Sequence, residues 1–478
     1  MGCDIYFDAK TYYNPLNSEF LVQFQYLGIK IREMLRKTIL FMPFMFLGVF
    51  LSAQGFYGSE PEPVKKGLSD AQLLEEVQRV TFRYFWDFAD PTSGLARERS
   101  NTNTGYGHEV ITSGGSGFGI MAIIVAVERK WITREQGVER LLKIVNYLRK
   151  NADSFHGMFP HWWYAESGRT KPFSRKDDGG DIVESAFMFQ GLLCVVEYFD
   201  GDTPKERELR HKANLTWREA EWDWYTRGGR EVLYWHWSPN NGWSMDFEIR
   251  GYNECLLAYV LGAASPTYPI DPSVYHKGWA MSNFFKNGRQ FYGIILPLGF
   301  DYGGPLFFAH YSFLGLNPKG LKDRYADYWE QNRNHTLINR AYCIDNPKKF
   351  NGYGADCWGL SASDDCFGYS AHSPENDNGT ISPTAALSSM PYTPEYSMQA
   401  LRYFYDKMGD KLWTKYGFVD SFSPSTGCVS KSHLAIDQGP IIVMIENYRT
   451  GLLWKLFMKN KDIQNGLAKL GFEYQIPE

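Results

Sequence analysis

Carboxylates stand where polar loops run into apolar stretches of this chain. Asp178 and Asp181 frame an Asp-Gly-Gly-Asp motif, Glu254 precedes Cys-Leu-Leu, and Asp437 precedes Gln-Gly-Pro. Hydrolysis of a glycosidic bond requires two carboxyl groups: a protonated one gives a proton to the leaving oxygen, and an ionised one activates water or attacks directly. We therefore predict that the catalytic carboxyls are among these residues.

The stretch from Trp235 to Glu254 places aromatic rings and amides around one of these acids. Trp243 and Tyr252 lie close to Glu254 in the sequence, and aromatic faces with polar edges suit the C–H faces of a sugar. A carboxyl among such rings would have a raised pKa, as a general acid requires. An aromatic core beside solvated acids, such as Asp246 and Glu248, is the alternative interpretation.

Each candidate acid also has a structural interpretation. Asp181, with Glu184 three residues later, has the spacing of a helix capping box. Asp437 could cap the final helix, and Glu254 could interact with a helix dipole. A purely structural role explains Asp178 less well than it explains the other acids. Sequence spacing alone leaves these alternatives open.

Other loop residues are candidates for substrate binding, beside Asp178, Asp181, Trp243 and Tyr252. They are His161, Trp162, His310, Tyr311, Trp358, Asp364 and Glu446. Glu446 is spaced to pair with Arg449, and a buried ion pair is the favoured interpretation of that spacing. The glycine run at 115–119 is weakly similar to a phosphate loop, but no strand precedes it, so close helix packing explains it better.

Helices of two kinds must position these residues. Amphipathic helices are predicted at Ser69–Phe88, Arg134–Lys150, Pro204–Tyr225, Lys319–Asn334, Pro394–Lys407 and Lys461–Leu470. Uniformly apolar segments follow Gly119, Asp181, Gly251, Pro305, Pro383 and Pro440. These segments recur roughly every 55 to 80 residues, as in a repeating helical array.

The two kinds of helix together predict an all-α fold. A helix that is apolar all round belongs inside, and one with a single apolar stripe belongs outside. We therefore predict an (α/α)6 barrel of six inner and six outer helices. The loops before the inner helices would gather at one face, with short β-hairpins, such as one at Val232–Trp237, in the rim loops.

The composition is that of a globular protein whose partner is uncharged. Of 478 residues, 44% are hydrophobic and 17% aromatic, and the formal net charge is -4 with no basic stripe that would indicate nucleic acid. No CxxC pair, HExxH motif or Cys/His cluster occurs, so we expect no metal or other cofactor. Cys194 and Cys255 are expected in the core. Cys343, Cys357 and Cys366 are close enough for a disulfide whose pairing stays open.

The N-terminal region contains a predicted secretion signal. From Met34, a charged segment, an apolar run from Thr38 to Val49 and small residues near Ala53 match a signal peptide. The predicted organisation is an upstream extension at 1–33, with Met34 as an alternative start, a signal peptide at 34–53, a linker at 54–67 and one domain at 68–478. No other segment approaches about 18 uninterrupted apolar residues. We expect a mature monomer, periplasmic or secreted, that does not enter a membrane.

Several strings of the sequence resemble a known family. They are Thr112–Gly119, Gly251–Glu254, Gly304–Phe308, Trp358–Asp364, Pro383–Ala386, Asp437–Pro440 and Glu446–Arg449. Jointly they are similar to the bacterial endo-β-1,2-glucanase family of glycoside hydrolases, whose domain is also called glucoamylase-like. The resemblance runs from about Leu68 to Tyr474.

The resemblance implies an (α/α)6 barrel and a secreted enzyme that cleaves β-1,2-glucan or its oligosaccharides with inversion. It implies that Glu254 is the general acid and Asp437 the base-side carboxylate, with Asp178 and Asp181 in the sugar-binding cleft. Endo and exo action both stay open. A glucoamylase-like or β-glucosidase-type hydrolase of another glucan, or a non-catalytic glycan-binding protein, could use the same barrel.

Overall fold

Helices dominate the computed structural model, which describes residues 60–101 and 108–475. Contacts within residues 58–478 define one structural unit. The predicted upstream extension and signal peptide lie outside the described residues, so both stay predictions. None of the helices in the described part combines the length and apolarity needed to span a bilayer.

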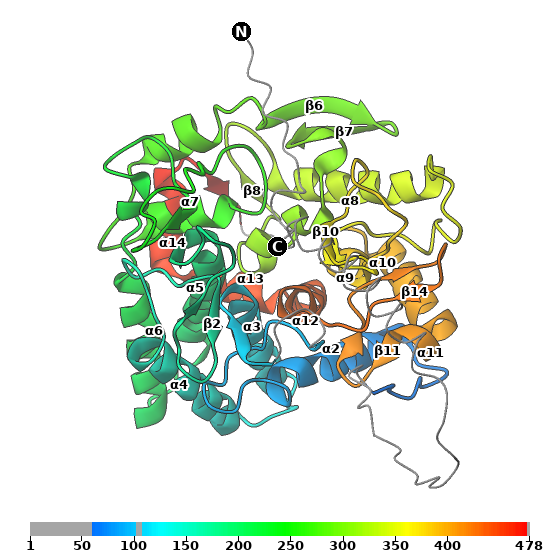
Figure 1. Cartoon of the computed structure of the whole chain (residues 1–478), viewed down its shortest axis with the longest axis horizontal. Coiled ribbons are helices and arrows are strands. Elements are labelled where there is room, and N and C mark those ends of the chain that lie inside the picture. Colours follow the sequence, from blue (N-terminus) through cyan, green and yellow to red (C-terminus); the bar gives the residue numbers. More distant parts are fainter. Residues whose placement is uncertain (1–59, 102–107, 476–478) are drawn as a thin grey trace, which may run out of the picture. The chain divides into compact units, whose positions relative to one another are not determined.

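Five helices are buried along most or all of their length. They are α3 (Gly114–Glu128), α5 (Ile182–Tyr198), α7 (Leu256–Ala264), α9 (Pro383–Leu387) and α12 (Ala435–Thr450). In Figure 1, α3 lies beside both α5 and α12. Their burial agrees with the prediction that uniformly apolar segments lie inside.

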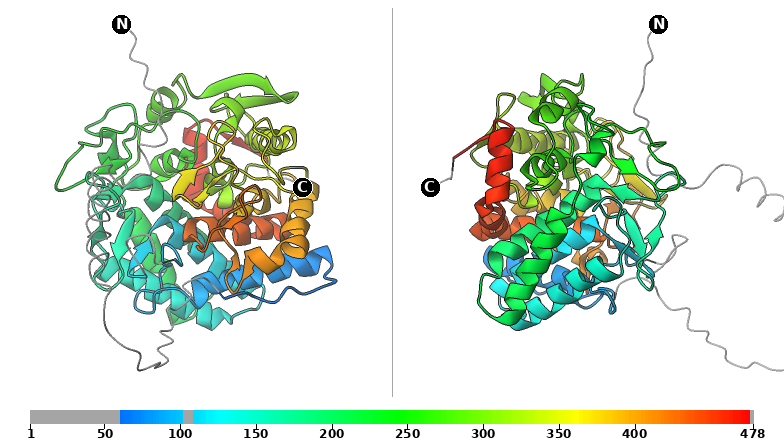
Figure 2. Two further views of the ribbon diagram at one scale, coloured as in Figure 1. Left: turned by 45° about the vertical axis from the view of Figure 1, so that its right-hand side comes forward. Right: turned by 90° about the vertical axis from the view of Figure 1, so that its left-hand side faces the viewer.

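Helices with one buried side cover this inner set. They are α2 (Asp70–Trp86), α4 (Arg134–Lys150), α6 (Pro204–Arg218), α8 (Tyr328–Asp345), α10 (Pro394–Arg402), α13 (Leu452–Lys459) and α14 (Lys461–Lys469). A short helix, α11 (Gly409–Leu412), follows α10. The pair α4 and α6 packs side by side, and α14 packs on α7 (Figures 1 and 2).

Helix starts are set by local side-chain chemistry. Ser69 and Gln72 form a reciprocal capping box at α2, and Thr133 and Gln136 form another at α4. Each box satisfies two backbone N–H groups that the first helical turn leaves without partners. The sequence contained these signals, and both helices begin where predicted.

The glycines of α3 allow helices to approach closely. A Cβ added at Gly117 would lie 2.2 Å from the backbone oxygen of Phe187 on α5, and one at Gly115 would lie 2.6 Å from Cβ of Ala435 on α12. Any side chain there would force neighbouring helices apart. The packing interpretation of this glycine run is confirmed.

Small antiparallel pairings decorate the helices. One three-stranded sheet joins β1 (Val110–Thr112), β2 (Trp162–Tyr164) and β3 (Thr170–Lys171). Two-stranded pairs in the described part are β4 (Gly180–Asp181) with β5 (His236–Trp237), β6 (Lys286–Phe291) with β7 (Ile294–Leu298), β8 (Leu321–Lys322) with β15 (Glu473–Tyr474), β9 (Ala362–Asp364) with β10 (Tyr369–Ala371), β11 (Trp413–Thr414) with β12 (Gly417–Phe418), and β13 (Phe422–Ser423) with β14 (Cys428–Val429). The run Val232–Trp237 is therefore not a hairpin by itself, because β5 pairs with the distant β4.

Two predicted helices differ from the structure. The segment predicted at Lys319–Asn334 is helical only from Tyr328, where Asp327 accepts hydrogen bonds from the backbone N–H groups of the first turn. The apolar segment after Pro305 forms the 3-10 turns η5 (Leu306–Ala309) and η6 (Tyr311–Leu314). Apolar runs predict burial, but they do not decide between an α-helix and shorter turns.

Two other helix boundaries are shifted. The helix α7 begins at Leu256, so Glu254 precedes it and does not lie one turn inside. The last buried helix, α12, begins at Ala435, so Pro440 lies inside it as its sixth residue, and the C-cap residue Gly451 adopts the left-handed conformation.

The cysteines divide into four buried thiols and one disulfide in the described part of the chain. Cys194 and Cys255 are buried as predicted, and Cys343 and Cys357 are also buried and reduced. Cys366 pairs with Cys428, with 6.4 Å between their Cα atoms. The expected pair among Cys343, Cys357 and Cys366 is therefore wrong, because the partner of Cys366 lies 62 residues further along the chain.

Candidate active site

Two groups of carboxyls lie where buried helices begin. One includes Glu254, just before α7, and the other includes Asp437, in the first turn of α12. Residues of η6 contact both. The Tyr311 hydroxyl donates to Asp437 Oδ1 at 3.2 Å, while the hydroxyl of the next residue, Ser312, donates to the backbone oxygen of Glu254. Adjacent residues thus contact acids that are 183 positions apart. The prediction that Glu254 and Asp437 come from separate junctions to one region agrees with these contacts.

Glu254 has the environment of a proton donor. Its side chain is half-buried, and the enclosed Oε2 has no hydrogen-bond partner among the described residues. Burial raises the pKa of Glu254 to about 7, and the negative charges of Glu184 and Asp181 act in the same direction. A carboxyl with this pKa holds its proton over much of the neutral range, as a general acid must.

Histidines balance the acids at the start of α5. Asp181 Oδ2 lies 3.2 Å from His161 Nδ1 and 3.2 Å from His236 Nε2, and Asp177 Oδ2 lies 3.0 Å from the same His236 nitrogen. We call these four residues the histidine cluster. Asp181 also caps α5 by accepting from the N–H groups of Val183 and Glu184, so the prediction that Asp181 is a helix cap is confirmed.

The histidine cluster supplies its own positive charge. Burial lowers the pKa of His161 and of His236, but neighbouring carboxylates outweigh burial and raise the values to about 9 and about 10. Burial opposes ionisation of Asp181 as well, yet the two imidazoliums hold its pKa below the ordinary range. His161, Asp177 and Asp181 are spaced so that they could hold a cation, with ligand atoms within 4.8 Å of one another. The charged imidazoles already neutralise these carboxylates.

Glu184 extends the cluster toward α3. Its Oε2 accepts the backbone N–H of Gly114 at 2.8 Å, so it does not complete a capping box with Asp181. Burial raises the pKa of Glu184 to about 7, although His161 acts against this.

Asp437 belongs to a buried pair of carboxyls. It lies in the first turn of α12 and is 1% exposed, and Asp420 is 2% exposed. Apart from a proton held between the two carboxyls, Asp437 Oδ2 and Asp420 Oδ1 have no hydrogen-bond donor among the described residues. Burial raises the pKa of Asp437 to about 7, although hydrogen bonds with Asp420 and Tyr311 act against this. Burial and the neighbouring Asp437 raise the pKa of Asp420 well above its ordinary value. One proton shared by the two carboxyls accounts for these observations.

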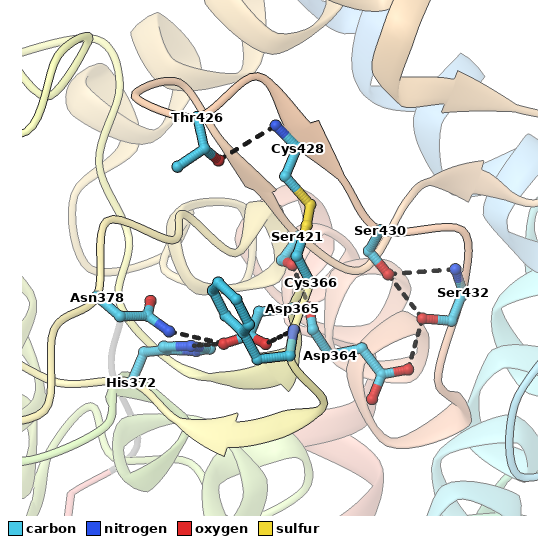
Figure 3. The surroundings of a disulfide bond; sticks show 11 residues. Asp364, Asp365, Cys366, His372, Asn378, Ser421, Thr426, Cys428, Ser430 and Ser432 are labelled. Carbon is cyan, nitrogen blue, oxygen red and sulfur yellow. Dashed lines mark hydrogen bonds and ion pairs between the residues drawn. A yellow bond between two sulfur atoms is a disulfide. The ribbon is translucent and has the colours of Figure 1, made fainter. Parts of the chain in front are cut away.

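Asp364 supports this carboxyl pair from the β9–β10 hairpin. Its backbone N–H donates to Asp420 Oδ2 at 2.6 Å, and its carboxylate accepts from Arg99 at 2.9 Å and Ser432 at 2.6 Å. Figure 3 shows Asp364 beside Ser432, close to the Cys366–Cys428 disulfide that ties the hairpin to β14. Asp364 therefore holds Asp420 through its backbone N–H, while its carboxylate pairs with Arg99 and raises the pKa of both Asp420 and Asp437.

Several predicted substrate contacts are instead packing residues. Trp358 is fully buried, Tyr252 is 2% exposed with its hydroxyl donating to Asn332, and His310 is 1% exposed and bonded to Ser389. Burial lowers the pKa of His310 to about 3, so it stays neutral in the core. The sequence shows that these residues lie near junctions, but it does not show that their side chains point inward.

Glu446 is also corrected, in favour of the ion-pair interpretation but with another partner. It is fully buried in the C-terminal half of α12 and accepts from Arg129 at 2.8 and 3.0 Å, whereas Arg449 pairs with Glu75. Nine residues separate it from Asp437, or about 13 Å along the helix. It ties α12 to the end of α3.

The remaining predicted contacts lie on the acid-bearing loops. Asp178 accepts from Asn240 and Asn241 in the aromatic stretch, and Trp243 packs on Tyr225 and Tyr234. Trp162 lies edge-on to His161, with the ammonium of Lys171 over its ring. In this stretch Asp246 pairs with Arg227 and Glu248 with Arg250, so neither is a free acid.

Sequence reasoning missed three acid or imidazole groups. His236 lies in the aromatic stretch and Asp177 directly precedes the Asp-Gly-Gly-Asp motif, so their types offered a signal. Asp420 offered none, because its segment resembles any loop after a strand.

A surface cavity of about 990 Å³ lies elsewhere, between α2, α10 and the end of α12, and its lining includes Tyr403 and Tyr448.

Comparisons with known proteins identify the family of this chain. A family model described as "Putative glucoamylase" matches residues 246–461. A crystal structure of a protein given the same description, from Bacteroides uniformis ATCC 8492, is 63% identical, has a TM-score of 0.84 and covers 86% of this chain and 99% of that chain. An endo-β-1,2-glucanase from Chitinophaga pinensis, solved with sophorotriose and glucose, is 55% identical with a TM-score of 0.83, over 85% of this chain and 99% of that one.

A curated relative matches over part of its length. The exo β-1,2-glucooligosaccharide sophorohydrolase (non-reducing end) of Parabacteroides distasonis is 45% identical over an alignment of 424 residues that covers 84% of this chain. The chain spans 58% of that relative's length. A mostly helical fold with small β-pairs and buried, paired carboxyls defines the class, that of glycoside hydrolases. The chain belongs to the glucoamylase-like family that contains the bacterial β-1,2-glucanases.

Proposed function

We propose that this protein hydrolyses β-1,2-glucan or β-1,2-gluco-oligosaccharides with inversion at the anomeric carbon. Two observations carry the proposal. Neighbouring residues of η6 contact both acids, since Tyr311 donates to the Asp437 carboxyl and Ser312 to the Glu254 backbone oxygen. Burial also raises the pKa of both carboxyls to about 7. The named relatives that act on β-1,2-linked glucans support the linkage.

Each carboxyl has a defined role in this proposal. Glu254 gives its proton to the glycosidic oxygen as the bond to the anomeric carbon breaks. Asp437 accepts a proton from the attacking water, directly or through a substrate hydroxyl, while Asp420 holds the proton that the pair shares. Asp178 binds sugar hydroxyls in the cleft, whereas Asp181, which is fully buried, positions His161 and His236. After turnover, proton exchange with solvent restores Glu254 and Asp437.

We further propose that the helices form the (α/α)6 barrel. The helices α3, α5, α7, α9 and α12 would supply five inner positions, and the 3-10 turns η5 and η6 the sixth. All five helices are buried, and η6 contacts both α7 and α12. The active site would then lie at the face where the inner segments begin.

Export to the periplasm or the exterior is part of the proposal. The disulfide Cys366–Cys428 includes an exposed cysteine, and disulfides of this kind persist in oxidising compartments. N-terminal sequencing of the exported protein would test the predicted cleavage near Ala53.

The deciding experiment is an assay of purified protein on linear β-1,2-glucan and on starch. We expect sugar release from the first alone, with a product whose anomeric configuration is inverted. Glu254→Gln should lower kcat at least about 100-fold. Glu248→Gln, which alters an acid of the same stretch that pairs with Arg250, is the matched control and should keep normal turnover. Release from starch would favour an α-glucan hydrolase, and binding without cleavage a glycan-binding protein.

A further inference from the structure

We propose that four phenylalanine rings, Phe284, Phe300, Phe308 and Phe307, form a stacking track for the glucan chain that leads to the carboxyls and sets the preferred chain length. This inference rests on the proposed function and adds a binding surface to it. We call these residues the aromatic track.

The rings form a continuous series. Phe284 lies 5.9 Å from Phe300, Phe300 lies 6.5 Å from Phe308, and Phe308 lies 4.8 Å from Phe307, centroid to centroid. Phe307 stacks on Tyr311 at 4.8 Å, with the ring planes 28° apart. Because the Tyr311 hydroxyl donates to Asp437, the inner end of the track is in contact with the carboxyl pair.

The outer end of the track lies beside the loop of the proposed acid. The residue three positions before Glu254 is Gly251, with φ of +81°, and a Cβ built there would lie 3.0 Å from Cβ of Phe284. At the middle of the track, Gly304 has φ of +76°, and its Cβ would lie 3.0 Å from the Phe308 ring. Both glycines satisfy the left-handed backbone and leave room for an aromatic ring.

The exposure of the rings is greatest at the outer end. Phe307, Phe308 and Phe300 are half-buried, whereas Phe284 is 47% exposed. Its neighbour Phe285 is fully buried, and the turn is held by a hydrogen bond from Phe285 N–H to Ser282 oxygen at 3.2 Å. The Phe284 ring, on the opposite side of this turn from the buried Phe285, is therefore partly exposed next to Phe300.

A glucan chain is the occupant that fits these features. Aromatic faces bind the C–H faces of pyranose rings, and a row of rings offers successive positions to successive sugar units. Phenylalanine adds no polar group that would select one hydroxyl pattern, so the track recognises length while the carboxyl region recognises the linkage. Short oligosaccharides would occupy the carboxyl region without reaching Phe284.

The test measures affinity for β-1,2-gluco-oligosaccharides of increasing length by calorimetry. It uses Glu254→Gln protein, which prevents turnover, with and without Phe284→Ala. We expect Phe284→Ala to weaken binding of the longer oligosaccharides about twofold to tenfold and to leave the shortest unchanged. Phe284→Tyr, which keeps the ring, should restore the length dependence. Ile295→Ala removes a side chain that is 56% exposed on β7 and is the matched control.

The outcomes separate this inference from the proposed function. If no oligosaccharide is bound or cleaved by the unsubstituted protein, both fail. The aromatic track alone is wrong if the unsubstituted protein cleaves the glucan and the affinity rises with oligosaccharide length by the same amount with and without Phe284→Ala. An equal loss of affinity at every length would also overturn it, because that pattern indicates a displaced Glu254 loop.

Discussion

The histidine cluster and the Asp420–Asp437 pair are two buried acid groups with opposite electrostatic solutions. In the first, imidazoliums of His161 and His236 stabilise the ionised form of Asp181. In the second, the direct neighbour of Asp437 is another carboxyl, and both pKa values rise. The comparison shows how one fold keeps some carboxylates permanently charged and holds others near the point of proton transfer.

Removing the charge of Asp437 should have the largest effect. Asp437→Asn keeps the volume and the contact with Tyr311 but cannot accept a proton, so kcat on β-1,2-glucan should fall about 100- to 10,000-fold. Asp178→Asn should raise KM more than it lowers kcat, since that side chain is expected to bind sugar. Near-normal kcat in Asp437→Asn would remove it from the base side.

Loss of one imidazole should break the histidine cluster. His236→Asn leaves Asp177 and Asp181 buried without their shared counter-charge, which typically costs about 3–5 kcal/mol of unfolding free energy. Urea unfolding at pH 7 would measure it. His211→Asn, on the exposed side of α6, serves as control and should be nearly neutral. If the two variants unfold alike, the cluster is not the ionic network described here.

Breaking the Cys366–Cys428 disulfide, which lies near the carboxyl pair, should lower the free energy of unfolding less than the loss of His236 does. The bond closes a loop across a sequence separation of 62 residues, so the double variant Cys366→Ser and Cys428→Ser should lose about 2–4 kcal/mol. Reduced wild-type protein should unfold at the same denaturant concentration as the variant. A difference between them would show that the serines have an effect of their own.

The smallest effect concerns the pH profile. Activity should fall as pH rises through about 7, where Glu254 loses its proton, and as pH falls and Asp437 gains one. Asp420→Ala removes the hydrogen bond that stabilises ionised Asp437, so the acid limb of kcat/KM should move to higher pH, by up to about one unit. Asp420→Asn keeps an N–H donor and should leave the limb in place. Movement to lower pH would identify Asp420 as the ionised member of the pair.

Much of the helical framework could be predicted from the sequence. Capping residues and periodic apolar positions marked α2, α4 and α14 almost to the residue, because these signals act within one or two turns. The segment after Pro305 was uniformly apolar and still formed 3-10 turns. Its geometry depends on neighbours such as Leu360 and Ser361, which contact it from far along the chain.

The candidate site was predictable only in part, for a similar reason. Glu254 and Asp437 stood out because each begins an apolar segment, and family motifs surrounded them. Trp358 and His310 stood in comparable places and are core residues. Side-chain direction at a junction depends on packing between helices, which sequence spacing does not describe.

By itself, the sequence determined where chain segments become helical, which helices are buried, and which family the motifs resemble, since these follow from local hydrogen bonding and from apolar periodicity. Only the tertiary structure decided which charges meet. His236 reaches Asp177 and Asp181 through the β4–β5 pairing, Asp420 meets Asp437 across a helix start, and Cys428 meets Cys366. Protonation depends on burial and on charges within a few ångströms, and both are properties of the folded chain.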